Sequence, residues 1–131
     1  MVEFINKMIT RQSFERFVSV FLGKELTSGG GLTKHHIDAL EINEDILQVR
    51  GWAFNLGKKF SPDLIYFRAG ENYMISSCAL KRPDVKRVFD LNSEMVGFHL
   101  KIKSSDVEKS ELKIGFVSEN SMSEFLLMKE V

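Results

Sequence analysis

From residue 37 onward, the chain consists of short runs with period-two alternation of apolar and polar residues, and this pattern constrains the fold more than any other feature. The runs cover residues 37–42, 46–54, 64–69, 73–80, 96–102, 112–118 and 125–128. Turn-forming residues separate them at roughly eight-to-twelve-residue spacing. A parallel sheet would need crossover helices, for which these connections leave no room. The pattern therefore predicts a mainly β domain, a seven-stranded antiparallel immunoglobulin-like β-sandwich.

One segment within this region has helical character. Pro83 suits the first position of a helical turn, and Asp84 suits the positive end of its dipole. Val85, Val88 and Phe89 fall on one side. We expect this segment, residues 83–89, to cross from one sheet to the other.

The N-terminal residues have the period of an amphipathic helix. Its apolar stripe is formed by Phe14, Phe17, Val18, Phe21 and Leu22, and Phe4 and Met8 extend it earlier in the chain. Polar residues 10–13 offer capping side chains, so one helical segment is expected to end and another to begin there. Three glycines at 29–31 favour a linker after Leu26. We therefore expect two parts, a helical segment with its linker at 1–34 and a β-sandwich module at 35–131.

Composition and charge exclude several classes of protein. The 131 residues are 44% hydrophobic, enough for a real core, and 18 basic residues balance 18 acidic ones. A neutral chain without a recognition motif argues against binding nucleic acid. The N-terminus has no signal-peptide pattern, and no apolar run approaches the ~18–20 residues that span a bilayer. We expect a cytoplasmic location with no transmembrane segment.

The residues that could carry catalysis or bind metal lack the necessary spacing. Cys78 is the single cysteine and has no neighbouring histidine, which indicates a packed thiol. The three histidines, His35, His36 and His99, form no ligand motif. No serine occupies a nucleophile elbow. We predict no metal, no cofactor and no enzymatic activity.

Four short motifs together resemble a known kind of module. They are Gly51-Trp52-Ala53, the turn Gly70-Glu71-Asn72, Arg82-Pro83-Asp84-Val85 and Gly97-Phe98. Over about residues 37–130, the chain resembles the small β-sandwich modules that accompany bacterial cell-envelope glycosyltransferases and related surface-polysaccharide proteins. The resemblance implies a non-catalytic accessory domain in glycan assembly, with a glycan or a glycosyltransferase as partner.

Two functional hypotheses follow. In the first, the module binds glycan, and the polar and aromatic groups of the contact surface are Asn72, Tyr73, Arg82, Asp84 and Lys86. The simpler role for Arg82 and Asp84 is structural, with Asp84 capping the helical turn and Arg82 bonding backbone carbonyls. Trp52 is either the central core anchor or a platform for stacking a sugar. In the second hypothesis, the N-terminal helix mediates self-association as a homodimer or docking to a larger protein. The simpler outcome for this helix is that it packs back onto its own sandwich.

Overall fold

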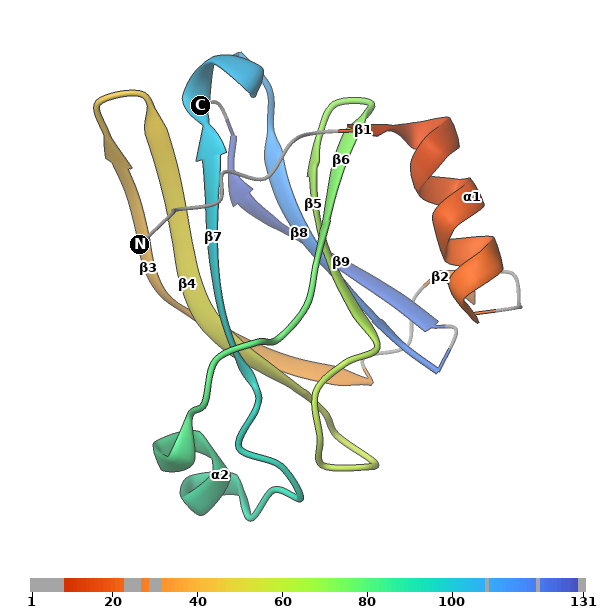
Figure 1. Ribbon diagram of the computed structural model, residues 1–131, viewed down its shortest axis with the longest axis vertical. Coiled ribbons are helices and arrows are strands. Elements are labelled where there is room, and N and C mark those ends of the chain that lie inside the picture. The colour runs from red at the N-terminus through yellow and green to blue at the C-terminus, as the bar shows by residue number, and fades with distance from the viewer. Residues whose placement is uncertain (1–8, 23–26, 29–31, 108, 120, 130–131) are drawn as a thin grey trace.

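The computed structural model describes residues 9–22, 27–28, 32–107, 109–119 and 121–129, which form a mainly β protein of two sheets (Figure 1). The smaller sheet has the order β3 (Thr33–Asn43), β4 (Ile46–Asn55), β7 (Gly97–Lys103). The larger has the order β1 (Ile9–Thr10), β6 (Asn72–Ser76), β5 (Leu64–Ala69), β8 (Leu112–Ser118), β9 (Ser121–Met128), β2 (Thr27–Ser28). A short 3-10 turn, η1 (Ser104–Asp106), connects β7 to β8.

Each of the seven predicted runs corresponds to one long strand, but the predicted count of seven is too low. Within the described residues, β1 and β2 add two-residue strands at the edges of the larger sheet. The sheets are also not purely antiparallel, because β2 pairs in parallel with β9. The fourth long strand, β6, bonds to β5, whereas in the constant-type immunoglobulin fold the fourth strand lies in the sheet of the first two.

The helical segment α2 (Pro83–Phe89) connects the two sheets as predicted, since β6 belongs to the larger sheet and β7 to the smaller. Pro83 occupies the start of the helix, and Asp90 ends it with a left-handed backbone. Val85 is buried, but Val88 is 75% exposed. Of the three residues expected on one side of the helix, Val88 is thus exposed, because only one short side of a two-turn helix faces the sheet.

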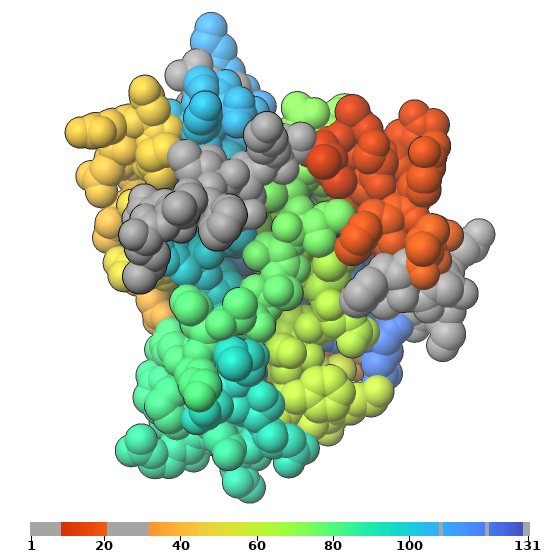
Figure 2. Space-filling view, viewed as in Figure 1, coloured from red at the N-terminus to blue at the C-terminus, as the bar shows by residue number. Residues whose placement is uncertain are grey.

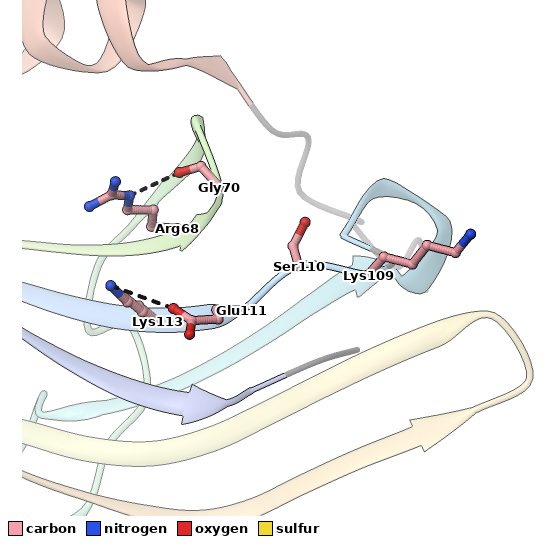
Figure 3. Close-up of a pocket in the computed structure, with 6 residues that line it drawn as sticks. All are labelled: Arg68, Gly70, Lys109, Ser110, Glu111 and Lys113. Atoms are coloured by element: carbon pink, nitrogen blue, oxygen red, sulfur yellow. Dashed lines mark hydrogen bonds and ion pairs between the residues drawn. The ribbon is translucent and has the colours of Figure 1, made fainter.

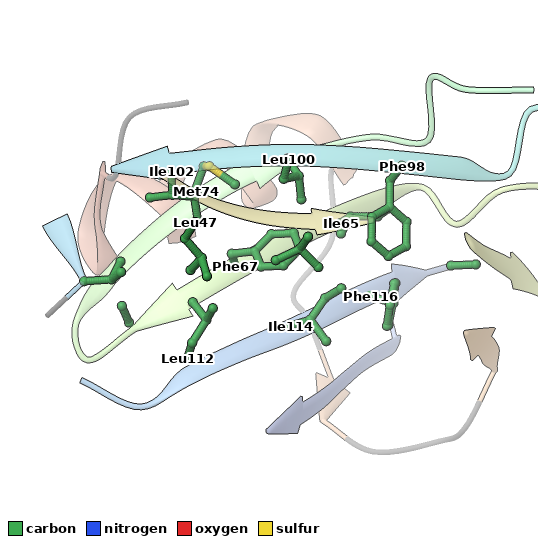
Figure 4. Packing of buried hydrophobic residues seen from close by; sticks show 14 residues of the cluster. Leu47, Ile65, Phe67, Met74, Phe98, Leu100, Ile102, Leu112, Ile114 and Phe116 are labelled. Carbon is green, nitrogen blue, oxygen red and sulfur yellow. The ribbon is translucent and has the colours of Figure 1, made fainter. Parts of the chain in front are cut away.

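The main core fills the space between the two sheets (Figure 4). Alternate residues of β4, β5, β7 and β8 supply it, as the period of two requires. Its largest fully buried members include Phe67, Phe98, Phe116, Leu47 and Ile114. Burial of these side chains is the main source of stability in the sandwich.

The helix α1 (Arg11–Leu22) covers the outer face of the larger sheet, and its start is capped as expected. The backbone N–H of Ser13 donates to Thr10 Oγ1 at 3.2 Å. Phe14 and Val18 are buried against Tyr66 and Tyr73. The helix α1 thus packs on the larger sheet of the sandwich.

Other residues of the predicted stripe differ in placement. Phe17 is 42% exposed. The backbone of Phe21 and Leu22 belongs to α1, while their side chains lie outside the described part of the chain, as do Phe4 and Met8. The glycines at 29–31 also lie outside it, but Thr27–Ser28, expected to belong to the linker, pairs with β9 as β2. Among the helices that the structure describes, none is long and apolar enough to cross a bilayer.

Candidate functional site

The five residues predicted to bind a ligand fall into two separate groups. Asn72 and Tyr73 begin β6, beside the turn that joins β5 to β6, whereas Arg82, Asp84 and Lys86 belong to the α2 region at the opposite end of the molecule (Figure 1). Figure 2 shows the surface of the α2 region and that of α1 at opposite corners. The structure therefore does not bring the five into one surface.

Tyr73 cannot serve as a ligand platform in this arrangement, because α1 covers it. It is buried, and the ring of Phe14 stacks on it with centroids 4.3 Å apart and an interplanar angle of 10°. Burial is the main cause that raises the pKa of its hydroxyl. Asn72 remains exposed on the turn and pairs with Thr10 of β1.

Arg82 is the centre of the most ordered polar cluster near α2. Its Nε and Nη2 donate to the two carboxylate oxygens of Asp84 at 3.0 and 2.9 Å, and its Nη1 donates to Asp38 Oδ2 at 2.6 Å. The Arg82 guanidinium holds the pKa of Asp84 at about 2, and the two carboxylates raise the pKa of Arg82 itself. The sequence-based role was wrong in detail, since Arg82 bonds two carboxylates and so ties α2 to β3.

Local backbone features fix Arg82 and Asp38 in this position. The backbone N–H of Arg82 donates to Glu94 O at 2.7 Å, and Leu80 exchanges two backbone hydrogen bonds with Gly97 at the start of β7. The register of β3 against β4 shifts between Ile37 and Ala39, which leaves Asp38 at a bulge. A bulge re-aims the side chain of the extra residue, and here Asp38 meets Arg82.

Trp52 lies next to this cluster on the outer face of the smaller sheet. It pairs with His36 on β3 and with Gly97 on β7, and directly paired residues point to the same face. A Cβ at Gly97 would lie 2.8 Å from Arg82 Cγ. The absence of a side chain at Gly97 thus lets the Arg82 stem cross β7 beside Trp52.

The burial of Trp52 lies between that of a central core anchor and that of an exposed stacking platform, the two roles considered from the sequence. The ring is partly buried, with centroids 5.8 Å from Phe54 and 5.2 Å from Phe89, and 5.8 Å from the His36 ring. It contributes to a small cluster beneath α2 and is not the central anchor of the inter-sheet core. Trp52 remains partly exposed.

A hollow of about 390 Å³ lies beside the Arg82–Asp38 pair, and Trp52 and His36 are not among the residues that line it. Ala39, Gly51 and Gly97 line it and leave space because they have little or no side chain. Arg82 and Arg50 also line it, together with Asp38, Leu80 and Phe98. We call the surface formed by Trp52, His36, Asp38, Arg82 and this hollow the Trp52 face.

A second hollow, of about 280 Å³, lies near the β5–β6 turn and is lined by Arg68, Gly70, Lys109, Ser110, Glu111 and Lys113 (Figure 3). Arg68 donates to Gly70 O at 2.9 Å, and Lys113 lies 3.8 Å from Glu111, while Lys109 points away from them. None of the described residues that line this hollow is aromatic. It offers charge without a stacking surface.

The acidic partner behind the second hollow is Glu124 of β9. It accepts a hydrogen bond from the buried Tyr66 hydroxyl at 2.9 Å and contacts Arg68 at 3.5 Å and Lys113 at 3.8 Å. Two of the three cations that line the hollow, Arg68 and Lys113, are thus paired with Glu124 and Glu111. This network stabilises the sheet and leaves little net charge for a ligand.

Cys78 is the most reactive type of side chain in the sequence, and its surroundings suppress that reactivity. Its Sγ lies 3.4 Å from Val96 O, and burial raises the pKa of the thiol to about 12. Because the thiolate is the reactive form, Cys78 is a poor nucleophile at neutral pH. It is a packed thiol, as the sequence predicted.

Comparisons with known proteins add no relative to this description. No family model, no curated protein and no solved structure matches the chain. The geometry of the Trp52 face is therefore the basis for a functional conclusion.

Proposed function

We propose that this chain is a non-catalytic accessory module that binds carbohydrate at the Trp52 face. One observation carries the proposal. Trp52 is partly exposed and pairs with His36 on β3 and with Gly97 on β7, where the Arg82 stem passes, and Arg82 in turn lines a hollow. This arrangement combines one aromatic surface with a small number of convergent polar groups, which is the usual composition of a small-molecule site.

The chemistry of these groups suits a sugar. A pyranose ring has apolar C–H faces that pack against an aromatic ring, and hydroxyl groups at its edges that need hydrogen-bond partners. An indole supplies a large rigid apolar surface. Arg82 donates hydrogen bonds and Asp38 accepts them, so both roles of a sugar hydroxyl can be met beside Trp52.

The biological setting is part of the same proposal and rests on the resemblance described above. It would place the module beside a bacterial glycosyltransferase in the assembly of surface glycan, with a cytoplasmic location. We also propose an immunoglobulin-like classification of the sandwich. Its support is the distribution of the seven long strands, with the first, second and fifth in one sheet and the others in the second.

Calorimetric titration with oligosaccharides tests the proposal. Replacing Trp52 by Leu keeps an apolar side chain in the cluster beneath α2 and removes the aromatic surface. We expect affinity to fall at least about fivefold, equivalent to about 1 kcal/mol of lost stacking. Lys109→Ala, in the second hollow, is the matched control and should bind like the wild type. Equal binding by Trp52→Leu and wild type would place the ligand elsewhere.

A second candidate function is self-association through α1. It is favoured by the exposure of two apolar side chains of the helix, Phe17 at 42% and Val20 at 80%. Sedimentation of wild type and of a Phe17→Glu variant tests it. A dimer that becomes a folded monomer supports self-association, whereas a wild type that is monomeric at high micromolar concentration excludes a stable homodimer.

A further inference from the structure

We infer that the Trp52 face takes a neutral saccharide and discriminates against acidic ones. This inference rests on the proposed function and narrows its ligand class. It follows from how the charged residues that line the hollow are paired, and it differs from the expectation for an unpaired basic edge, which would attract phosphate or carboxylate groups.

The cations near the hollow are balanced by carboxylates. Arg82 is shared between Asp38 and Asp84. Arg50, the other arginine that lines the hollow, lies 3.7 Å from Glu41. Two arginines thus face three carboxylates. An anionic ligand would have to compete with Asp38 and Asp84 for Arg82 and would approach their negative charge directly.

A neutral hydroxyl group meets no such penalty. A carboxylate has about four lone-pair sites. In Asp38, Oδ2 accepts from Arg82, and Oδ1 lies 3.7 Å from His36 Nε2, beyond ordinary hydrogen-bond distance. Asp38 therefore keeps acceptor capacity for a hydroxyl donor while it stays paired with Arg82. A hydroxyl can also share a guanidinium N–H without displacing either carboxylate.

The arrangement is also preorganised. The Arg82 side chain is only 27% exposed and is held by three hydrogen bonds to two different elements, α2 and β3. Binding then costs little side-chain entropy, because the rotamer is already fixed. Apolar contact with Trp52 and hydrogen bonds to an immobile Arg–Asp pair favour a sugar that presents one apolar face and at least one equatorial hydroxyl pair.

This inference is tested with two neutral probes, maltotriose and N,N′,N″-triacetylchitotriose, and one acidic probe, trigalacturonate. The fluorescence of Trp52 reports binding directly, because it is the single tryptophan. We expect at least one neutral probe to bind more tightly than trigalacturonate. Its Kd should change less than about twofold between about 20 mM and about 500 mM sodium chloride, since no net charge is neutralised.

Asp38→Asn is the matched variant, because it keeps the size of the side chain and removes its charge. It should weaken neutral binding about fivefold, the effect of one lost net hydrogen bond, and strengthen binding of trigalacturonate by freeing Arg82. A native-like amide spectrum for Asp38→Asn shows that this variant is folded. Lys86→Ala is the control substitution, and its thermal midpoint should be unchanged.

The outcomes separate the inference from the function on which it rests. Tighter, salt-sensitive binding of trigalacturonate to the wild type would overturn the inference and leave carbohydrate binding intact. If neither neutral nor acidic probes change the fluorescence or the amide spectrum at millimolar concentration, the proposed function fails together with the inference.

Discussion

The docking of α1 on the larger sheet can be tested with one pair of matched substitutions. Val18 and Val20 lie two residues apart on the same helix, and they differ in burial, 2% against 80% exposed. Changing either to alanine raises helix propensity by the same few tenths of a kcal/mol. The difference between the two variants therefore isolates the free energy of burying Val18 against the sheet.

The magnitude follows from the atoms removed. Val18→Ala deletes two buried methyl groups, worth about 0.8 kcal/mol each in transfer free energy. The cavity left behind adds roughly 24 cal/mol per Å³ where the surroundings do not collapse. We expect Val18→Ala to lower the free energy of unfolding by about 2 kcal/mol relative to Val20→Ala, with partial collapse around a surface helix limiting the cavity contribution.

Urea unfolding, followed by far-UV circular dichroism and by Trp52 fluorescence, measures this difference. The two probes report on different parts of the molecule, since Trp52 lies on the smaller sheet and α1 on the larger. Coincident transitions with a gap of about 2 kcal/mol would confirm that α1 unfolds with the sandwich. If the two variants agree within about 0.5 kcal/mol, the ordinary range for exposed sites, the reasoning that α1 is docked is refuted.

Three other predictions follow from the packing. Gly115→Ala should destabilise the protein severely, because a Cβ at this position would overlap the Tyr66 ring, and soluble expression or the urea midpoint would reveal it. Cys78, whose thiol pKa is raised to about 12, should react slowly with Ellman's reagent in the native state and rapidly in urea; fast native reaction would contradict its burial. Burial lowers the pKa of His35 below 6.5 in the folded protein. As the pH falls below about 6.5, the unfolded chain therefore takes up a proton at His35 before the folded chain does, and the free energy of unfolding decreases. The wild-type urea midpoint should therefore fall more than that of His35→Phe between about pH 7.5 and about pH 5, and parallel curves would argue against this contribution.

The sequence predicted the long strands well because each has a clear period. All seven predicted runs became strands, and the α2 helix began at Pro83 as expected. The two additional strands could not be predicted, because β1 and β2 have two residues each, too few to establish any period. Their pairing depends on where α1 docks, which is a tertiary property.

The candidate site was predicted less well, and burial explains why. Tyr73 was expected at a surface, although β5 contains the uninterrupted apolar run Leu64 to Phe67. Such a run indicates a strand covered on both faces, and α1 provides that second cover over β5 and β6. This signal was present in the sequence and points to the burial of Tyr73.

The contribution of Asp38 could not be read in the same way. It lies 44 residues from Arg82, and only the bulge in β3 directs it toward α2. Gly97 was recognised within a motif, but its role in admitting the Arg82 stem requires the register of β7 against β4. Sequence spacing alone does not contain that register.

The central claim, that the Trp52 face is the binding surface, is tested most directly by mapping amide and indole chemical shifts during titration with a neutral trisaccharide. Trp52 gives the single indole N–H resonance of the protein. Our account predicts that this resonance shifts together with the amides of His36, Asp38 and Gly97, and that the amides near Arg68 do not move. Shifts confined to the hollow near Arg68, or no shifts at millimolar saccharide, would contradict it.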